Sequence, residues 1–156
     1  MISPQILNAF RETLSSEENL VLEYQLRALN YIKPFLENQF RLEDEISQLV
    51  KTKEGDNPAF GYDMAINDIF LNLLEESHYE GSLYSEESGW EQRGSLDEVI
   101  VSDPVCNSSL LRRGFRNVAS GVTFFHGKEF VAGALTDFGS YTICLANRER
   151  VLRLMV

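Results

Sequence analysis

The chain has 156 residues, which is typical of a single domain with one sizeable hydrophobic core. Hydrophobic residues make up 44% of it and charged residues 24%, as in an ordinary soluble globular protein. The formal net charge of −10 predicts a surface that repels phosphate backbones and anionic lipids, which argues against nucleic-acid binding and against docking on a membrane.

No segment approaches the roughly 20 apolar residues of a membrane span, and the N-terminus lacks a signal-peptide pattern. Two cysteines, Cys106 and Cys144, do not make a disulfide framework, and neither histidine has the spacing of a zinc ligand. These features together predict a cytoplasmic protein.

The first fifty residues predict three helices. The first begins at Ser3-Pro4, because proline suits the first helical position. The second runs from about residue 17 to 39 and carries an apolar face broad enough to pack on a sheet or another helix; Pro34 is expected to bend or shorten it. A third helical segment is expected at 42–50.

A polar loop is expected at 51–60, followed by a fourth helix at about 63–77. Asp63 lies in the first turn of that helix, where the helix dipole alone explains an acidic residue. A short strand is expected at 82–85, and a loop that contains Trp90 is expected at 88–95.

The apolar run 99–101 predicts a buried strand that ends in Asp103, and Pro104 is expected to stop its ladder. Residues 107–109 are good turn and helix-capping residues. A carboxylate beside backbone N–H groups at a turn suits a cation and a phosphate, although Asp-Pro after a strand is more often a plain turn.

The remainder of the chain predicts an antiparallel meander. Strands are expected at 118–125, 129–136 and 141–146, with a last strand at 151–156. Helices followed by consecutive antiparallel strands predict an α+β fold, with the helices packed on a mainly antiparallel sheet.

The order of the acidic motifs resembles the metal-dependent phosphatase superfamily that includes inositol monophosphatase and fructose-1,6-bisphosphatase. That family has an Asp on a helix, a later Glu-Glu, and then Asp-Pro-(Ile/Leu)-Asp-Gly-(Thr/Ser). This chain has Asp63, then Glu86-Glu87, then Asp103-Pro104-Val105 and a following Ser108-Ser109. The resemblance covers roughly residues 17 to 146.

The resemblance implies a role for each matched residue in Mg²⁺-dependent hydrolysis of phosphorylated sugars or inositol. Glu86, Asp103 and the backbone carbonyl of Val105 would be metal ligands, with Asp103 bridging two cations. Asp63 and Glu87 would position the attacking water. The phosphate would be held by Ser108 together with its neighbours Asn107 and Ser109.

Three departures from the family pattern predict that activity is impaired or lost. Cys106 stands where the family has its second Asp, and neutral Cys is a poor ligand for a hard cation. Asn107 stands where the family has Gly, although Asn also tolerates a left-handed conformation. Residues 1–156 match only the first domain of the family, without its second α/β domain.

Three hypotheses therefore remain open: a sugar- or inositol-phosphate phosphatase domain, a non-catalytic relative that serves binding or assembly, and an unrelated acidic α+β domain. The resemblance implies that a first domain alone would leave uncovered a face that normally meets the second domain. We therefore expect self-association through the apolar meander or the C-terminal strand, or a partner that covers this face.

Overall fold

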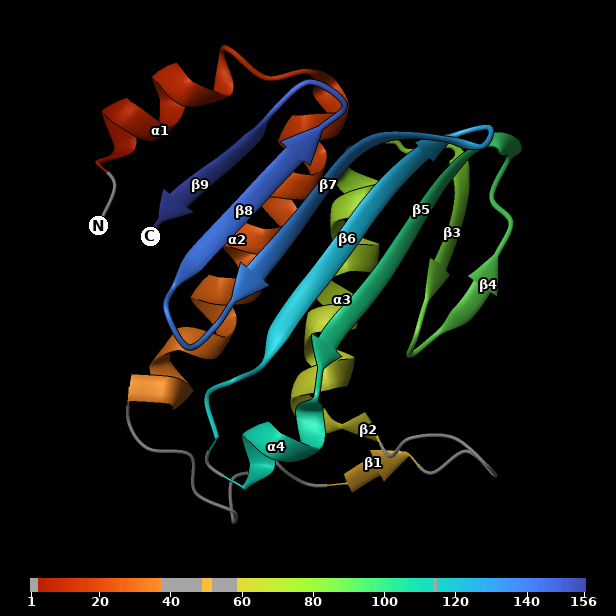
Figure 1. The fold of residues 1–156 in the computed structure, drawn as a ribbon. Coiled ribbons are helices and arrows are strands. Elements are labelled where there is room, and N and C mark those ends of the chain that lie inside the picture. Colours follow the sequence, from red (N-terminus) through yellow and green to blue (C-terminus); the bar gives the residue numbers. More distant parts are fainter. Residues whose placement is uncertain (1–2, 38–48, 52–58, 114) are drawn as a thin grey trace.

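The computed structural model describes residues 3–37, 49–51, 59–113 and 115–156, in which helices pack on one face of a seven-stranded sheet (Figure 1). Helix α1 spans Pro4–Arg11, and the side chain of Ser3 caps it by accepting a hydrogen bond from the Ile6 N–H at 3.3 Å. The predicted helix start at Ser3-Pro4 is therefore confirmed.

Helix α2 spans Ser16–Glu37 and is the longest helix of the described chain. Ser15 and Glu18 begin it with reciprocal bonds: the Glu18 N–H donates to Ser15 Oγ at 3.2 Å, and the Ser15 N–H donates to Glu18 Oε2 at 2.9 Å. The helix continues for three residues past Pro34, so this proline does not end it there.

The segment after α2 departs from the prediction. Residues 49–51 form strand β1, Leu49–Lys51, which pairs with β2, Ala59–Phe60, so the expected helix 42–50 is wrong at Leu49 and Val50. The rest of that helix and the middle of the expected loop 51–60 lie outside the described residues. Such short strands carry no periodicity of their own and form by pairing.

Helix α3 spans Gly61–Glu76, close to its predicted range, and lies beside α2 behind the sheet. The rings of Tyr24 and Phe70 join the two helices, with their centroids 5.0 Å apart. Both side chains are almost fully buried, and they belong to the same core as Leu83 and Ile100 of the sheet. The broad apolar face of α2 thus packs on both a sheet and a helix, as predicted.

The large sheet has the strand order β4-β3-β5-β6-β7-β8-β9. Only β3 and β5 run parallel among its neighbours; the other pairs are antiparallel, which confirms the predicted α+β class. The strands are β3 Gly81–Ser85, β4 Gly89–Glu91, β5 Ser95–Cys106, β6 Ala119–His126, β7 Glu129–Asp137, β8 Thr142–Asn147 and β9 Val151–Met155, and the short helix α4, Ser108–Arg112, follows β5. The meander is as predicted, whereas β4 replaces part of the expected loop 88–95.

Strand β5 does not stop at Pro104, contrary to the prediction. Its pairing with β6 is regular up to Asp103↔Gly121 and resumes at Cys106↔Ala119, so two residues, Pro104 and Val105, stand opposite Ser120 alone. This is a β-bulge, and a bulge is one of the few places where a strand accommodates proline, because the ladder needs no N–H there.

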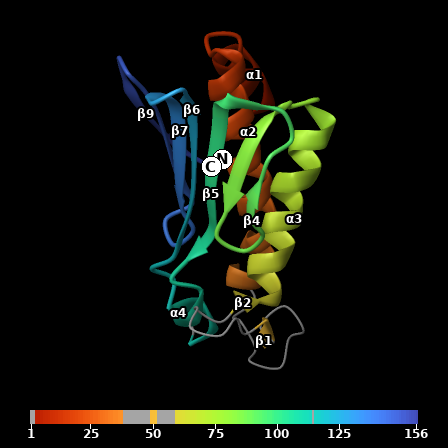
Figure 2. The ribbon, with the colours of Figure 1, turned by 90° about the vertical axis from the view of Figure 1, so that its right-hand side faces the viewer.

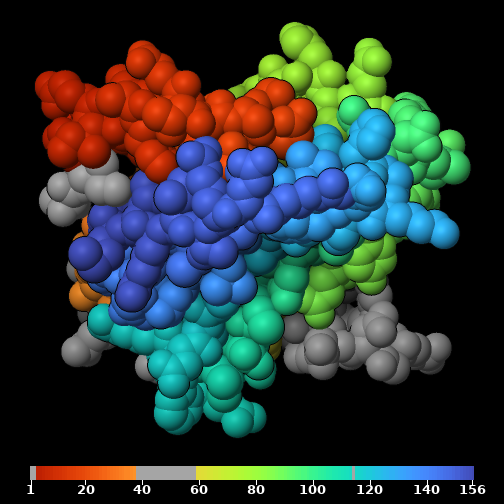
Figure 3. All heavy atoms as spheres, turned by 45° about the horizontal axis from the view of Figure 1, so that its top comes forward, coloured from red at the N-terminus to blue at the C-terminus, as the bar shows by residue number. Residues whose placement is uncertain are grey.

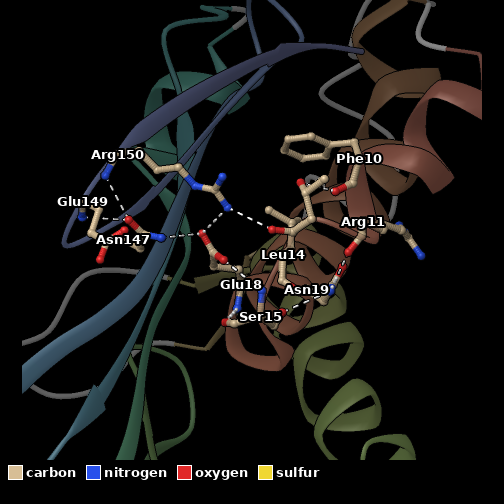
Figure 4. A network of polar contacts seen from close by, with 10 residues as sticks. Phe10, Arg11, Leu14, Ser15, Glu18, Asn19, Asn147, Glu149 and Arg150 are labelled. Carbon is tan, nitrogen blue, oxygen red and sulfur yellow. Dashed lines mark hydrogen bonds and ion pairs between the residues drawn. The ribbon is translucent and has the colours of Figure 1, made fainter.

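A polar cluster fastens the last hairpin to the junction between α1 and α2 (Figure 4). The Glu18 carboxylate is buried, accepts a hydrogen bond from Asn147 Nδ2 at 2.9 Å and lies 3.5 Å from an Arg150 nitrogen. Arg150 also donates to the Thr13 carbonyl at 3.1 Å. The turn between β8 and β9 is thereby held against the helical layer.

Figure 2 shows the two layers edge-on, with α2 and α3 on one side of the sheet. No helix that the structure describes covers the opposite face of the central strands. Nor is any described helix long and apolar enough to cross a membrane.

Candidate functional site

A pocket of about 240 Å³ lies where β3 and β5 end and α4 begins. Its lining comes from the turn after β3 and from the end of β5 with the start of α4. The lining residues are Glu86, Glu87, Asp103, Val105, Cys106, Asn107, Ser108 and Ser109. Every residue to which the sequence assigned a site role, other than Asp63, therefore lines one pocket.

The parallel pairing of β3 with β5 brings Glu86 and Asp103 together. Ser85 is in register with Ser102, and the Glu86 N–H donates to the Ser102 carbonyl at 3.1 Å. Each acidic residue follows one member of this serine pair. Because parallel strands end at the same edge of a sheet, the two carboxylates meet there.

The Asp103 carboxyl is strongly perturbed. Burial, followed by the charge and the hydrogen bond of Glu86, raises the pKa of Asp103 to about 6. Its Oδ1 atom is buried, and no described residue forms a hydrogen bond with it. Burial also raises the pKa of the Cys106 thiol, and the Asp103 charge adds to this effect, so the thiol stays protonated at neutral pH.

Asp63 combines a structural role with a place among the acidic residues. Its Oδ2 atom accepts a hydrogen bond from the Phe60 N–H at 2.7 Å, which caps α3, and the Ser108 side chain also hydrogen-bonds this carboxyl. Its Oδ1 atom is buried and has no further partner within hydrogen-bond distance among the described residues. Burial raises the pKa of Asp63 to about 8, and the charges of Glu87 and Glu86 contribute. The helix-start explanation is therefore correct but accounts for only one of the two carboxylate oxygens.

The turn into α4 has the conformation that the sequence allowed. Asn107 is left-handed, with φ 64° and ψ 35°, a region that Asn tolerates better than most residues. The Tyr62 hydroxyl donates to the Ser108 carbonyl at 2.6 Å, which ties α4 to α3. The serines at the mouth of the pocket are thereby placed on the same side as Asp63.

Asn67 and Ser85, which the sequence analysis did not single out, hold the acidic turn. Ser85 Oγ donates to Asn67 Oδ1 at 2.5 Å, and the Glu87 N–H donates to Ser85 Oγ at 3.3 Å. Both side chains are buried. The available signal was the spacing of Asn67 four residues after Asp63, which places the two on one face of α3.

A second buried group supports β5 from the core side. The Tyr24 hydroxyl accepts hydrogen bonds from Ser102 Oγ at 3.3 Å and from Ser120 Oγ at 3.4 Å. Burial raises the pKa of Tyr24 to about 12, so its hydroxyl stays neutral. Ser102 precedes Asp103, and this contact therefore fixes the strand from which the carboxylate projects.

The donor chemistry of the pocket fits a hard divalent cation such as Mg²⁺. The half-buried Asp103 has a carboxylate oxygen without a hydrogen-bond partner among the described residues, and Glu86 and Glu87 add two more carboxyl groups to the lining. Among the described residues, however, no group of three or more His, Cys, Asp or Glu side chains is already arranged around a metal position. The Cys106 thiol adds nothing that a hard cation prefers.

The sequence matches no protein-family model, and no curated protein matches it at a significant level. The fold does match solved structures. The extragenic suppressor protein SuhB from Bartonella henselae gives a TM-score of 0.75 at 15% identity, over 89% of this chain and 51% of that one. An inositol monophosphatase–fructose 1,6-bisphosphatase gives 0.75 at 19% identity, over 90% of this chain and 52% of the other.

A third match is SaIMPase-II bound to inositol monophosphate, with a TM-score of 0.64 at 16% identity, over 89% of this chain and 47% of that one. At such identities the likeness establishes the fold, and the resemblance inferred from the motifs is confirmed at that level. The chain spans about half the length of each of these structures.

Proposed function

We propose that this chain is a phosphatase-type domain that binds one hard divalent cation together with a phosphorylated sugar or inositol. The observation that carries the proposal is a cluster of acidic side chains: Asp103, Glu86 and Glu87 line one pocket, and the buried Asp63 carboxyl lies close enough to Glu87 and Glu86 for their charges to raise its pKa. Buried charges are normally paired or bound to a metal, and no described basic side chain lines this pocket.

The residues divide into two groups in this proposal. Glu86, Asp103 and the Val105 carbonyl would hold Mg²⁺, which when bound activates water and neutralises the leaving oxygen of a phosphate ester. Asp63 and Glu87 would accept hydrogen bonds from the attacking water and so fix its direction. The hydroxyls of Ser108 and Ser109, beside Asn107, would face the phosphate oxygens.

We further propose that hydrolysis by this chain is weak or absent, so that its role is binding or assembly. Cys106, a protonated thiol next to Asp103, supplies no charge where the resembling family has a carboxylate. One carboxylate fewer leaves less charge to hold a second cation.

Cation binding to the 156-residue chain tests this proposal independently of activity. Mn²⁺ binding, measured by the loss of the free-ion electron paramagnetic resonance signal and competed with Mg²⁺, is expected for the wild type and should be lost in Asp103→Asn. Asp68→Asn is the matched control, because Asp68 is exposed on the same helix as Asp63 and does not line the pocket.

Cys106→Asp separates the cation site from catalysis. It is expected to tighten Mn²⁺ binding, and phosphate release from inositol monophosphate in Mg²⁺ is expected to rise from near zero if the eroded carboxylate is the main defect. Tighter cation binding without phosphate release would favour a non-catalytic binding module. Absence of cation binding in both the wild type and this variant would refute the proposed site.

A further inference from the structure

A second and larger cavity, of about 760 Å³, lies at the end of the sheet opposite the acidic pocket. It is bounded by the start of α2, by the end of α3 with residues 77–80, and by Glu98 of β5. Figure 3 shows this end of the molecule, where the start of α2 (orange-red) lies next to the segment that leads from α3 into β3 (yellow-green). Roughly 17 Å of strand separates Glu98 from Asp103, so the two sites are distinct.

The floor of this cavity is apolar and aromatic. Leu20 of α2, Leu73 of α3 and Phe124 of β6 line it, and all three belong to the hydrophobic core or pack against it. The half-buried Tyr79 ring meets the Phe124 ring edge-on, with the centroids 5.9 Å apart, and the Tyr79 hydroxyl donates to the Ser82 carbonyl at 3.2 Å. The ring is therefore held in place, and the cavity offers a preformed surface of a size that suits a small molecule.

The two arginines of the lining are already engaged. Arg11 and Arg27 both bind the Glu23 carboxylate, with Arg27 Nε donating to Glu23 Oε1 at 2.8 Å. Arg27 also forms an ion pair with Glu76 at 2.8 Å, which joins α2 to α3. An anionic ligand would have to break these pairs before it could use either positive charge.

Two carboxylates of the lining are free by comparison. Neither Glu80 nor Glu98 forms a side-chain hydrogen bond or an ion pair with any residue that the structure describes. They lie at the starts of β3 and β5, which are parallel neighbours with Ser82 opposite Val99. Burial raises the pKa of Tyr79, and the charge of Glu98 raises it further, so this carboxylate lies near the phenol ring.

We propose that this cavity binds an organic ammonium ion, meaning an amine carried on an apolar body about the size of a phenyl ring. The ammonium group would lie between the Glu80 and Glu98 carboxylates and near the Tyr79 ring, where ion pairing and a cation–π contact both favour it. The apolar body would lie on Leu73 and Phe124. The proposal does not depend on the proposed function of the acidic pocket.

The charges around the cavity disfavour other classes of ligand. Its lining contains four glutamates and two arginines, and the whole chain carries a net charge of −10, so an anion is repelled. An uncharged ligand gains the apolar contact but leaves the half-buried Glu98 without a partner. An ammonium ion on an apolar body makes both contacts.

Three ligands with the same phenyl body separate the charge from the apolar contact: phenethylamine (cationic), phenethyl alcohol (neutral) and hydrocinnamate (anionic). Titration of the isotope-labelled 156-residue chain at physiological ionic strength, followed by its backbone amide NMR signals, gives the dissociation constant and the place of binding. We expect phenethylamine to bind about tenfold more tightly than phenethyl alcohol, because it gains a charged hydrogen bond, and hydrocinnamate not to bind. The largest shifts should fall at residues 77–80 and 98.

Substitutions that keep the size of the side chain test the two carboxylates. Glu98→Gln should weaken phenethylamine binding about tenfold without changing the binding of phenethyl alcohol. Glu80→Gln should weaken it about threefold, because this carboxylate is exposed. Asp68→Asn is the matched control, since it removes the same charge from an exposed position on α3 outside the lining. The amide spectrum of each variant verifies that it is folded.

Four results would overturn the proposal. They are the absence of phenethylamine binding, binding of the alcohol or of hydrocinnamate as tight as that of the amine, an effect of Asp68→Asn equal to that of Glu98→Gln, and shifts confined to the acidic pocket. An equal effect of the two variants would show attraction to the net negative charge alone. Loss of Mn²⁺ binding in Asp103→Asn is a separate measurement, so either proposal can fail without the other.

Discussion

Replacement of Asp63 by Asn is expected to remove a pH-dependent loss of stability. In the folded chain the pKa of Asp63 is raised to about 8 from an ordinary 3.8, chiefly by burial, so the folded state binds this proton more tightly than the unfolded state does. The stabilising contribution is fully present below about pH 4 and is lost as the pH rises through about 8. Asn imitates the protonated carboxyl and keeps an oxygen that can accept from the Phe60 N–H.

The size of the effect follows from the same two values. Their difference is about 4 pKa units, and at 1.36 kcal/mol for each unit the ceiling is roughly 6 kcal/mol, or about 1.4 kcal/mol for each pH unit between pH 4 and pH 8. A loss of that size would approach the whole stability of a typical domain. Water that reaches the carboxyl would reduce the pKa shift, so we expect the free energy of unfolding to fall by at least about 0.7 kcal/mol for each pH unit.

Urea unfolding in EDTA across this pH range measures the difference between the wild type and Asp63→Asn. The free energy of unfolding of the wild type should fall relative to that of the variant as the pH rises, whereas Asp68→Asn should follow the wild type, since Asp68 is exposed. Equal pH slopes for the wild type and Asp63→Asn would refute the assignment of Asp63 as a buried carboxyl with a raised pKa.

Three further substitutions test the supports of the fold and the site by urea unfolding. Glu18→Ala should cost about 2 kcal/mol or more, because it leaves the Ser15 N–H and the Asn147 amide without their buried acceptor, whereas Glu12→Ala on the exposed surface should cost little. Tyr24→Phe should cost about 1 kcal/mol, because two serine hydroxyls lose a buried partner. Asn107→Ala should cost about 1 kcal/mol and Asn107→Gly much less, since the position is left-handed.

Elements with their own periodicity or caps were predictable from the sequence. The helices α1, α2 and α3 and the strands of the meander fall close to their expected ranges. The strands β1 and β4 were missed because each has only three residues and exists through its partner. A short segment of this kind has no local pattern that distinguishes it from a loop.

The sequence predicted which acidic residues belong to the site, but it did not predict the buried side chains that hold them in place. The parallel pairing of β3 with β5 brings Glu86 to Asp103, and Glu87 and Glu86 lie close enough to Asp63 to raise its pKa. The family resemblance implied that these separated residues share one site, whereas no local pattern did. Asn67 carries a buried amide that accepts a hydrogen bond from Ser85, which lies 18 residues later in the chain. Local sequence gives no measure of such a contact.

The bulge at Pro104 decides to which side of the sheet residue 106 points. In a regular strand Cys106 would face the core, on the side opposite Asp103. The extra residue shifts the alternation by one, so Pro104 and Val105 are both buried and Cys106 emerges exposed on the same side as Asp103. Its thiol is therefore already where a second carboxylate would stand, close enough to affect the pKa of Asp103. In the proposed cation site, residue 106 is therefore the position at which a carboxylate would add charge, which the Cys106→Asp variant tests.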